Sequence, residues 1–146
     1  MSQAVKLRRL LEIGLLIAIY IAAAQAQSLL SELKAERDPA KRSEMALNLA
    51  DAAFDNARDF YSKGDFDNGD AQLEDMTTVL NECVASLALA HKAKFYKKAE
   101  LKVAYLQRRM QGLLDDIDIQ RRGWAEQTQR KLEEIHDKLL DGVMKK

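Results

Sequence analysis

The segment from Asp65 to Ala90 reads DFDNGDAQLEDMTTVLNECVASLALA, and its apolar positions decide the fold. These positions recur at alternating intervals of three and four residues, the spacing that places side chains on one face of an α-helix. The alternation is unbroken, as in the heptad seam of packed helices. We therefore expect a long amphipathic helix over residues 65–90. Its stripe consists of Phe66, Gly69, Leu73, Met76, Leu80, Cys83, Leu87 and Ala90.

A second stripe lies upstream, in a helix predicted over residues 39–63. Asp38 and Pro39 are a start signal, since Asp is a good N-cap and Pro is tolerated at the first helical position. Gly64 ends this helix, and Asp65 is expected to cap the next one. Such a short turn makes the two helices antiparallel, which predicts a helical hairpin. The stripe of the upstream helix consists of Leu47, Ala50, Phe54, Ala57 and Tyr61.

Two more helices are predicted over residues 96–117 and 123–143. The hydrophobic phase slips between Ala90 and Tyr96 although no glycine or proline marks the slip. We expect a bend or short loop near residues 91–95, and one continuous helix over residues 65–117 is the open alternative. The two stripes are Tyr96, Ala99, Val103, Leu106, Met110, Leu113 and Ile117, followed by Ala125, Thr128, Leu132, Ile135, Leu139 and Gly142.

The composition agrees with a helical protein. Of the 146 residues, 47% are hydrophobic and 32% are charged, while aromatic residues make up 6% and proline occurs once. Charged residues alternate with alanine, leucine and methionine along most of the chain, as in long amphipathic helices. We expect an all-α protein, an antiparallel three- to four-helix bundle over residues 39–146, without strands.

The N-terminus has the features of a secretory signal. Lys6, Arg8 and Arg9 form a positive region, and an apolar run of about 11 residues follows from Gly14. The sequence Ala-Gln-Ala then ends at Ala26 as a small-x-small cleavage site. The run is too short for a helix that must cross roughly 30 Å of hydrocarbon. We expect residues 1–26 to be a cleavable signal peptide, and the mature protein to be periplasmic or secreted.

Two alternatives for the N-terminus stay open. An uncleaved signal would act as an anchor, and only then would a membrane be a partner. The other alternative is that the segment is a buried helix of the domain. Residues 27–38 are expected to be a linker or a short helix.

The charge balance argues against nucleic acid as a partner. Cleavage would remove three basic residues and one acidic residue from the 23 of each kind, which leaves a net charge of about −2. The single cysteine, Cys83, excludes an intramolecular disulfide.

The turn of the first hairpin resembles a tetratricopeptide repeat (TPR). The resemblance covers about 35 residues and one copy, and it departs from the repeat in two places. Gly69 stands where alanine is usual, and the second helix continues past Asn81, where the repeat normally has proline. The matching positions are Ala57, Phe60, Gly64, Phe66, Gly69, Leu73 and Met76.

The whole chain also resembles an uncharacterised family of exported small helical proteins of acidobacterial type. The shared features are the D-P-x-x-R start of the hairpin (Asp38, Pro39 and Arg42) and the closing segment from Ile135 to Met144. This resemblance implies an exported location and a helical fold, but no activity.

No set of residues predicts catalysis. His91 and His136 are far apart, and no zinc or c-type haem motif includes them or Cys83. His136 is interpreted as a solvated flank of its stripe, and Cys83 as a buried inert thiol. The acidic cluster that begins at Asp65 lacks the spacing of a calcium loop. We expect no enzyme activity, no metal and no cofactor.

The remaining candidates are contact residues. Lys94, Lys98 and Lys102 share a helix face that could touch a polyanion, although a solvated face is the simpler interpretation. A self-association or partner face is expected among residues outside the main stripes, namely Leu89, Leu101, Tyr105 and Leu114. The sequence thus predicts an exported, non-enzymatic helical interaction or scaffold protein with an unidentified protein partner or a second copy. The alternative is a small-ligand or ion-binding helical bundle of the cell envelope.

Overall fold

The computed structural model describes residues 2–145, except that the side chains of residues 2, 11 and 14–27 lie outside the described part. Within residues 2–145 every regular element is helical, which confirms the predicted all-α class. The elements are α1 (Ser2–Ala35), α2 (Pro39–Ser62), α3 (Phe66–Ala90), α4 (Ala93–Asp116), the short 3-10 helix η1 (Ile119–Arg121) and α5 (Gly123–Met144).

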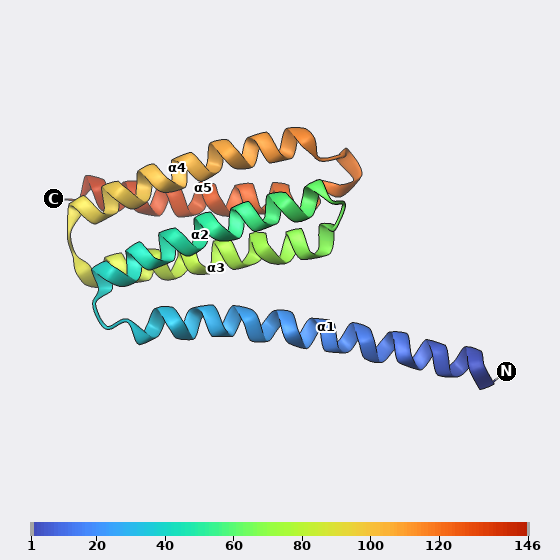
Figure 1. The fold of residues 1–146 in the computed structure, drawn as a ribbon. Coiled ribbons are helices and arrows are strands. Elements are labelled where there is room, and N and C mark those ends of the chain that lie inside the picture. Colours follow the sequence, from blue (N-terminus) through green and yellow to red (C-terminus); the bar gives the residue numbers. More distant parts are fainter. Residues whose placement is uncertain (1, 146) are drawn as a thin grey trace.

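The helices form three layers, which Figure 1 shows from the side. The hairpin of α2 and α3 lies between α1 on one side and the hairpin of α4 and α5 on the other. The C-terminal turns of α1 pack against the bundle, where Leu33 is fully buried and Leu29 contacts the core. The N-terminal half of α1 runs past the end of the bundle, and there Val5, Leu7 and Leu10 are exposed.

The two hairpins stack in parallel. Each hairpin is antiparallel within itself because its helices are joined by a short connection, and the chain reverses direction from each helix to the next. In the stack α2 lies beside α4, and α3 lies beside α5. Helices two apart in the chain run in the same direction. Contacts within a hairpin are therefore antiparallel, whereas the α2–α4 and α3–α5 contacts between the hairpins are parallel.

The core confirms the predicted stripes. The stripe residues of α2 are all buried, and so are those of α3 from Gly69 to Leu87. In α4 the stripe is buried from Ala99 to Ile117, and in α5 from Ala125 to Leu139. The stripe residues at the helix ends, such as Phe66 and Tyr96, are half-buried. Regular apolar spacing therefore identifies the face that each helix turns toward the core.

The turn between α2 and α3 differs from its prediction in one detail. Asp38 caps α2 as expected, because its carboxylate accepts a hydrogen bond from the Ala40 amide at 3.0 Å. Asp65 stands at the N-cap position of α3, but its side chain makes no capping hydrogen bond. It accepts a hydrogen bond from the Asn68 side chain at 2.7 Å instead. Gly64 has a φ of 75°, the left-handed conformation that glycine adopts without strain.

The phase slip after Ala90 is a true break. The helix α3 ends there and α4 begins at Ala93, so residues 65–117 do not form one continuous helix. His91 adopts a left-handed conformation with φ of 51°, and its amide donates to the Leu87 carbonyl at 3.1 Å. A left-handed residue at this position is a common way to end a helix, and here histidine takes the place of the usual glycine.

The α1 backbone is a single helix from Ser2 to Ala35, with no boundary at residue 27. The proposed cleavage point after Ala26 and the apolar run before it have side chains outside the described part. No helix within the described residues is long and apolar enough to span a membrane.

Candidate functional site

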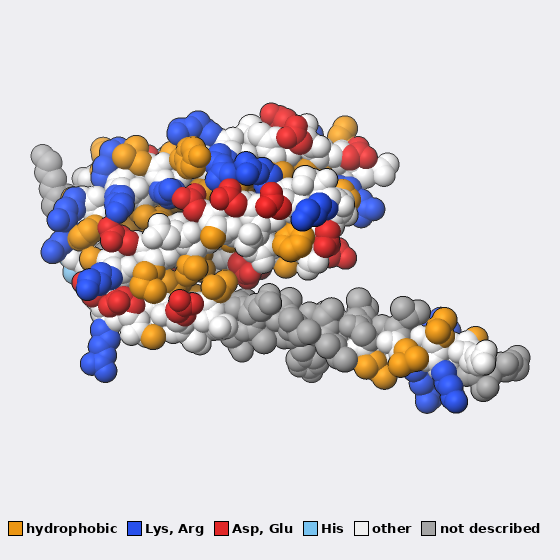
Figure 2. Space-filling model, in the orientation of Figure 1, with side chains coloured by type: hydrophobic (Ala, Val, Ile, Leu, Met, Phe, Trp, Pro, Cys, Tyr) orange, Lys and Arg blue, Asp and Glu red, His pale blue; other side chains and the backbone are white. Residues whose placement is uncertain are grey.

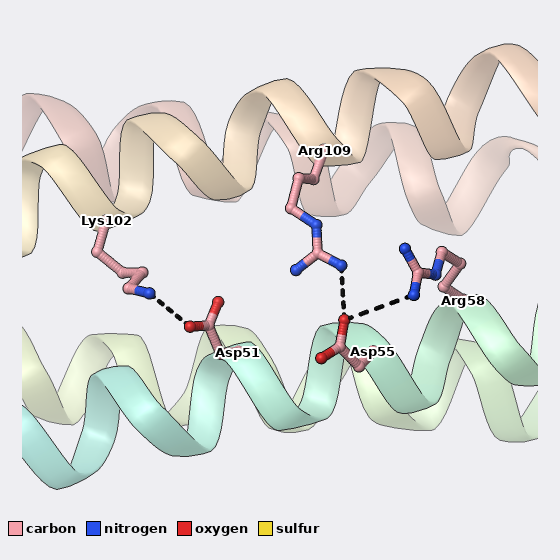
Figure 3. Close-up of polar contacts among 5 residues, drawn as sticks. All are labelled: Asp51, Asp55, Arg58, Lys102 and Arg109. Carbon is pink, nitrogen blue, oxygen red and sulfur yellow. Dashed lines mark hydrogen bonds and ion pairs between the residues drawn. The ribbon is translucent and has the colours of Figure 1, made fainter.

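Three ion pairs join the parallel helices α2 and α4. The nitrogen–oxygen distances are 2.5 Å for Lys98–Glu44, for Lys102–Asp51 and for Arg109–Asp55. Figure 3 shows the latter two pairs, and Figure 2 shows the row of basic side chains over the row of acidic ones. Residue numbers increase together along both helices, as parallel packing requires. Exposed ion pairs contribute about 0–1 kcal/mol each, so these pairs define the register of the stack more than its stability.

Arg109 is the most embedded cation of this seam. Its guanidinium carbon lies 4.4 Å from the centre of the Phe54 ring and 5.5 Å from that of Tyr105. Asp55, to which it donates, is also approached by Arg58 at 3.9 Å. One carboxylate therefore faces two guanidinium groups, as Figure 3 shows. Arg109 thus links the core aromatic residue of α2 to the outer aromatic residue of α4.

The lysines predicted as a polyanion contact fall into two groups. Lys98 and Lys102 point toward α2 and are paired with its carboxylates. Lys94 is exposed, and its ammonium lies 5.0 Å from the centre of the Phe95 ring. Pairing with Glu44 and Asp51 lowers the positive charge that this strip offers to another molecule.

The predicted partner face is partly exposed. The exposed fractions of Leu101 and Tyr105 are 56% and 43%, and both residues lie on the outer side of α4, one helical turn apart. Leu89 is 64% exposed at the end of α3. Leu114, in contrast, is only 4% exposed, so its assignment to this face was wrong. The buried arc of α4 widens there to include both Leu113 and Leu114, because the chain turns into η1 and α5 directly afterwards.

Shallow hollows follow the seam between α2 and α4. A hollow of about 290 Å³ is lined by residues that include Tyr61, Phe66 and Ile117. A second, of about 220 Å³, shares Arg58 with it and includes Phe54. Both are at or below the lower end of the volume range of small-molecule sites.

One polar cluster joins α4 to α5. Glu100 is 8% exposed, and its carboxylate contacts Lys97 Nζ at 3.0 Å and His136 Nε2 at 2.9 Å. The hydrogen bond from Lys97 first, and then that from His136, holds the pKa of Glu100 below its ordinary value. The prediction of a solvated His136 was therefore wrong, because the histidine is half-buried against a carboxylate one helix away. No periodicity in α5 alone could reveal that partner.

Two further candidates from the sequence analysis, Cys83 and the acidic turn, are enclosed or engaged. Cys83 is 1% exposed, so it is buried as predicted, and burial raises the pKa of its thiol to about 12, which disfavours the reactive thiolate. In the acidic turn, Asp70 accepts a hydrogen bond from the Tyr61 hydroxyl. Among the described residues no three His, Cys, Asp or Glu side chains are grouped as a metal site would require.

Comparisons with known proteins give no guide to the role of these residues. No protein-family model matches the chain, and it has no significant match among curated proteins or solved structures.

Proposed function

We propose that this chain is an exported, non-enzymatic helical protein that acts by docking another protein chain on the outer face of α4. The observation that carries the proposal is the exposure of Leu101 and Tyr105, which lie midway along the outer surface of α4. Large apolar side chains at the centre of a surface, with charged residues around them, are typical of protein contacts. Aromatic residues such as tyrosine are enriched at such contacts.

The charge pattern supports a protein partner over a polyanion. Two of the three strip lysines are paired with α2 carboxylates, so little free positive charge remains for phosphate groups. The arrangement of Glu100 and His136 also supports a non-enzymatic role. Glu100 and His136 bind each other between helices, and neither lines one of the hollows along α2 and α4.

Export rests on the N-terminal sequence, namely three basic residues before an apolar run and a small-x-small site ending at Ala26. The test is to fractionate cells that express the full-length chain with a C-terminal tag and to sequence the N-terminus of the product. We expect the product outside the cytoplasm, beginning at Gln27. A cytoplasmic product that still begins at Met1 would refute export.

Docking is tested by a photo-crosslinking residue placed at Tyr105, with the same residue at Lys138 as the control. Lys138 is exposed on α5, and the helical period places it on the opposite side from Gln129 and His136, which contact α4. We expect a discrete adduct from position 105 and none from position 138 when the exported protein is irradiated in the cell envelope. Equal labelling from both positions, or none from either, would remove the support for a docking face.

A second candidate is a small-ligand bundle, which the hollow of about 290 Å³ beside Tyr61 and Phe66 favours. Native mass spectrometry of the exported fraction distinguishes the two candidates. A stoichiometric small-molecule adduct that disappears in Phe66→Ala would favour the ligand candidate over docking.

A further inference from the structure

The charges at the two ends of α4 oppose the dipole of the helix. A helix carries partial positive charge at its N-terminus and partial negative charge at its C-terminus. The first turn of α4 has no acidic residue but contains Lys94, and Lys92 stands at its N-cap position. Its last turn has no basic residue and contains Asp115 and Asp116. Within one molecule this arrangement destabilises both ends of the helix.

The outer face of α4 has an apolar centre between these charged ends. Lys94, Leu101, Tyr105, Arg108 and Asp115 recur at intervals of seven, four, three and seven residues, and all five are exposed. They therefore form one ridge along the helix, as the 3.6-residue period requires. Figure 2 shows basic side chains along the N-terminal part of α4 and acidic ones near its C-terminal end. We call these five residues the outer ridge.

We propose that the partner of the outer ridge is a second copy of this chain, docked with the two α4 helices antiparallel about a two-fold axis. This inference rests on the proposed function and names the docked chain. In a symmetric contact the same patch must complement itself. The outer ridge meets this condition because one of its ends is basic and the other is acidic.

The register follows from the positions of the charges. With the axis between Ala104 and Tyr105, Lys94 of one copy faces Asp115 of the other, and symmetry supplies the same pair again. Leu101 and Tyr105 of both copies then lie close to the axis, and Arg108 faces Leu101, over which its aliphatic stem can lie. The lysine side chains at the N-terminal end of one α4 then lie beside the aspartate side chains at the C-terminal end of the other. Side chains that oppose the helix dipole within one copy are thus paired with opposite charges across the contact.

The expected dimer is weak and sensitive to salt. The outer ridge contributes two large apolar side chains per copy, Leu101 and Tyr105, so its apolar contact is small compared with that of stable interfaces of roughly 1,200–2,000 Å². The two Lys94–Asp115 pairs are exposed and would be screened by salt. We therefore expect dissociation on dilution and at high ionic strength.

Charge exchange tests the register directly. Sedimentation equilibrium is measured over a concentration series on the exported product, with the N-terminus that the cell leaves on it. Lys94→Asp and Asp115→Lys should each weaken the dimer about tenfold, because each change places two like-charged pairs across the axis. The double variant should return to within about threefold of the natural protein. Lys138→Asp, an exposed reversal on α5, is the control and should leave the dimer unchanged.

Cysteine crosslinking tests the position of the axis. Tyr105→Cys lies next to its own copy across the axis, whereas the two residues of Lys94→Cys would be about 32 Å apart at 1.5 Å per residue. We expect a disulfide-linked dimer from the former and none from the latter. The native Cys83 is buried and should not interfere. Circular dichroism of each variant verifies that the helices are intact.

Three results would overturn the proposal: a monomer at every concentration, a double variant no stronger than the single ones, or equal crosslinking from positions 94 and 105. The photo-crosslinker at Tyr105 separates this failure from failure of the proposed function. An adduct with a different protein would leave docking intact and refute the second copy, while no adduct at all would refute both.

Discussion

Replacing Gly142 by alanine should reveal how closely the C-terminal end of α5 packs against the N-terminal end of α4. A Cβ atom at this position would lie 2.3 Å from Cδ1 and Cε1 of the Tyr96 ring, and 2.8 Å from its Cγ. Ordinary contacts between carbon atoms are about 3.5–4.0 Å. Rotation of the ring cannot move Cγ away, because this atom lies on the axis of that rotation. The tyrosine must change rotamer, or the two helices must separate.

Two opposing effects determine the size of the change. Overpacking of this kind costs about 1–3 kcal/mol. Alanine is favoured over glycine in a helix by up to about 1 kcal/mol, and less than that here because Gly142 lies in the last turn of α5. We expect Gly142→Ala to lower the free energy of unfolding by roughly 1–2 kcal/mol. For a chain of this length the melting temperature would fall by about 3–8 °C.

The residue at position 96 decides whether Gly142→Ala destabilises or stabilises the protein. In Tyr96→Ala the clash is absent, so the same change at Gly142 should stabilise the protein by up to about 1 kcal/mol. Urea unfolding followed by circular dichroism of the four proteins gives the coupling energy directly. Stabilisation by Gly142→Ala in both backgrounds would show that Tyr96 does not pack on this glycine and would refute the reasoning.

Three further predictions concern buried groups. Leu106→Ala should cost about 2–5 kcal/mol in urea unfolding because the side chain is fully buried, whereas Leu101→Ala should stay within about 0.5 kcal/mol, and equal effects would contradict the packing. Glu100→Gln should destabilise the protein near neutral pH. A lowered pKa means that the carboxylate stabilises the fold above its unfolded-state value of about 4.5 and loses this effect as the pH falls through the folded value. The difference from the natural protein in thermal unfolding should therefore shrink toward pH 3, and a constant difference would exclude this linkage. Cys83, whose pKa is raised to about 12, should react with a thiol reagent only in denaturant, and rapid reaction of the native protein would show that the seam opens.

The sequence was a good guide to which face of each helix is buried, but not to which helix covers it. The stripe of α4 from Ala99 to Ile117 could be predicted because burial on one side imposes a period of 3.6 residues. The contact of Tyr96 with Gly142 could not, since it depends on how far α4 and α5 overlap. The same limit explains why Leu114 was placed on the outer surface, for periodicity is no guide at the end of a helix where the chain folds back.

The charged residues show most clearly that the sequence does not predict contacts between helices. Lys98 and Lys102 have the spacing of a free basic strip, and only the parallel packing of α2 against α4 brings carboxylates to both of them. A stripe pattern carries no information on whether neighbouring helices are parallel or antiparallel. His136 is a similar case, because its partner Glu100 belongs to another helix.

The stacking of two hairpins has a consequence for the order of folding. Among the described residues, the contact between α2 and α3 is the most extensive one between two helices, and all of it is formed by residues 39–90. A chain that leaves a translocation channel with its N-terminus first would have this hairpin complete while α5 is still inside the channel. Local contacts form fast because little loop entropy must be lost. The first hairpin can therefore act as a template on which α4 and α5 condense as they emerge.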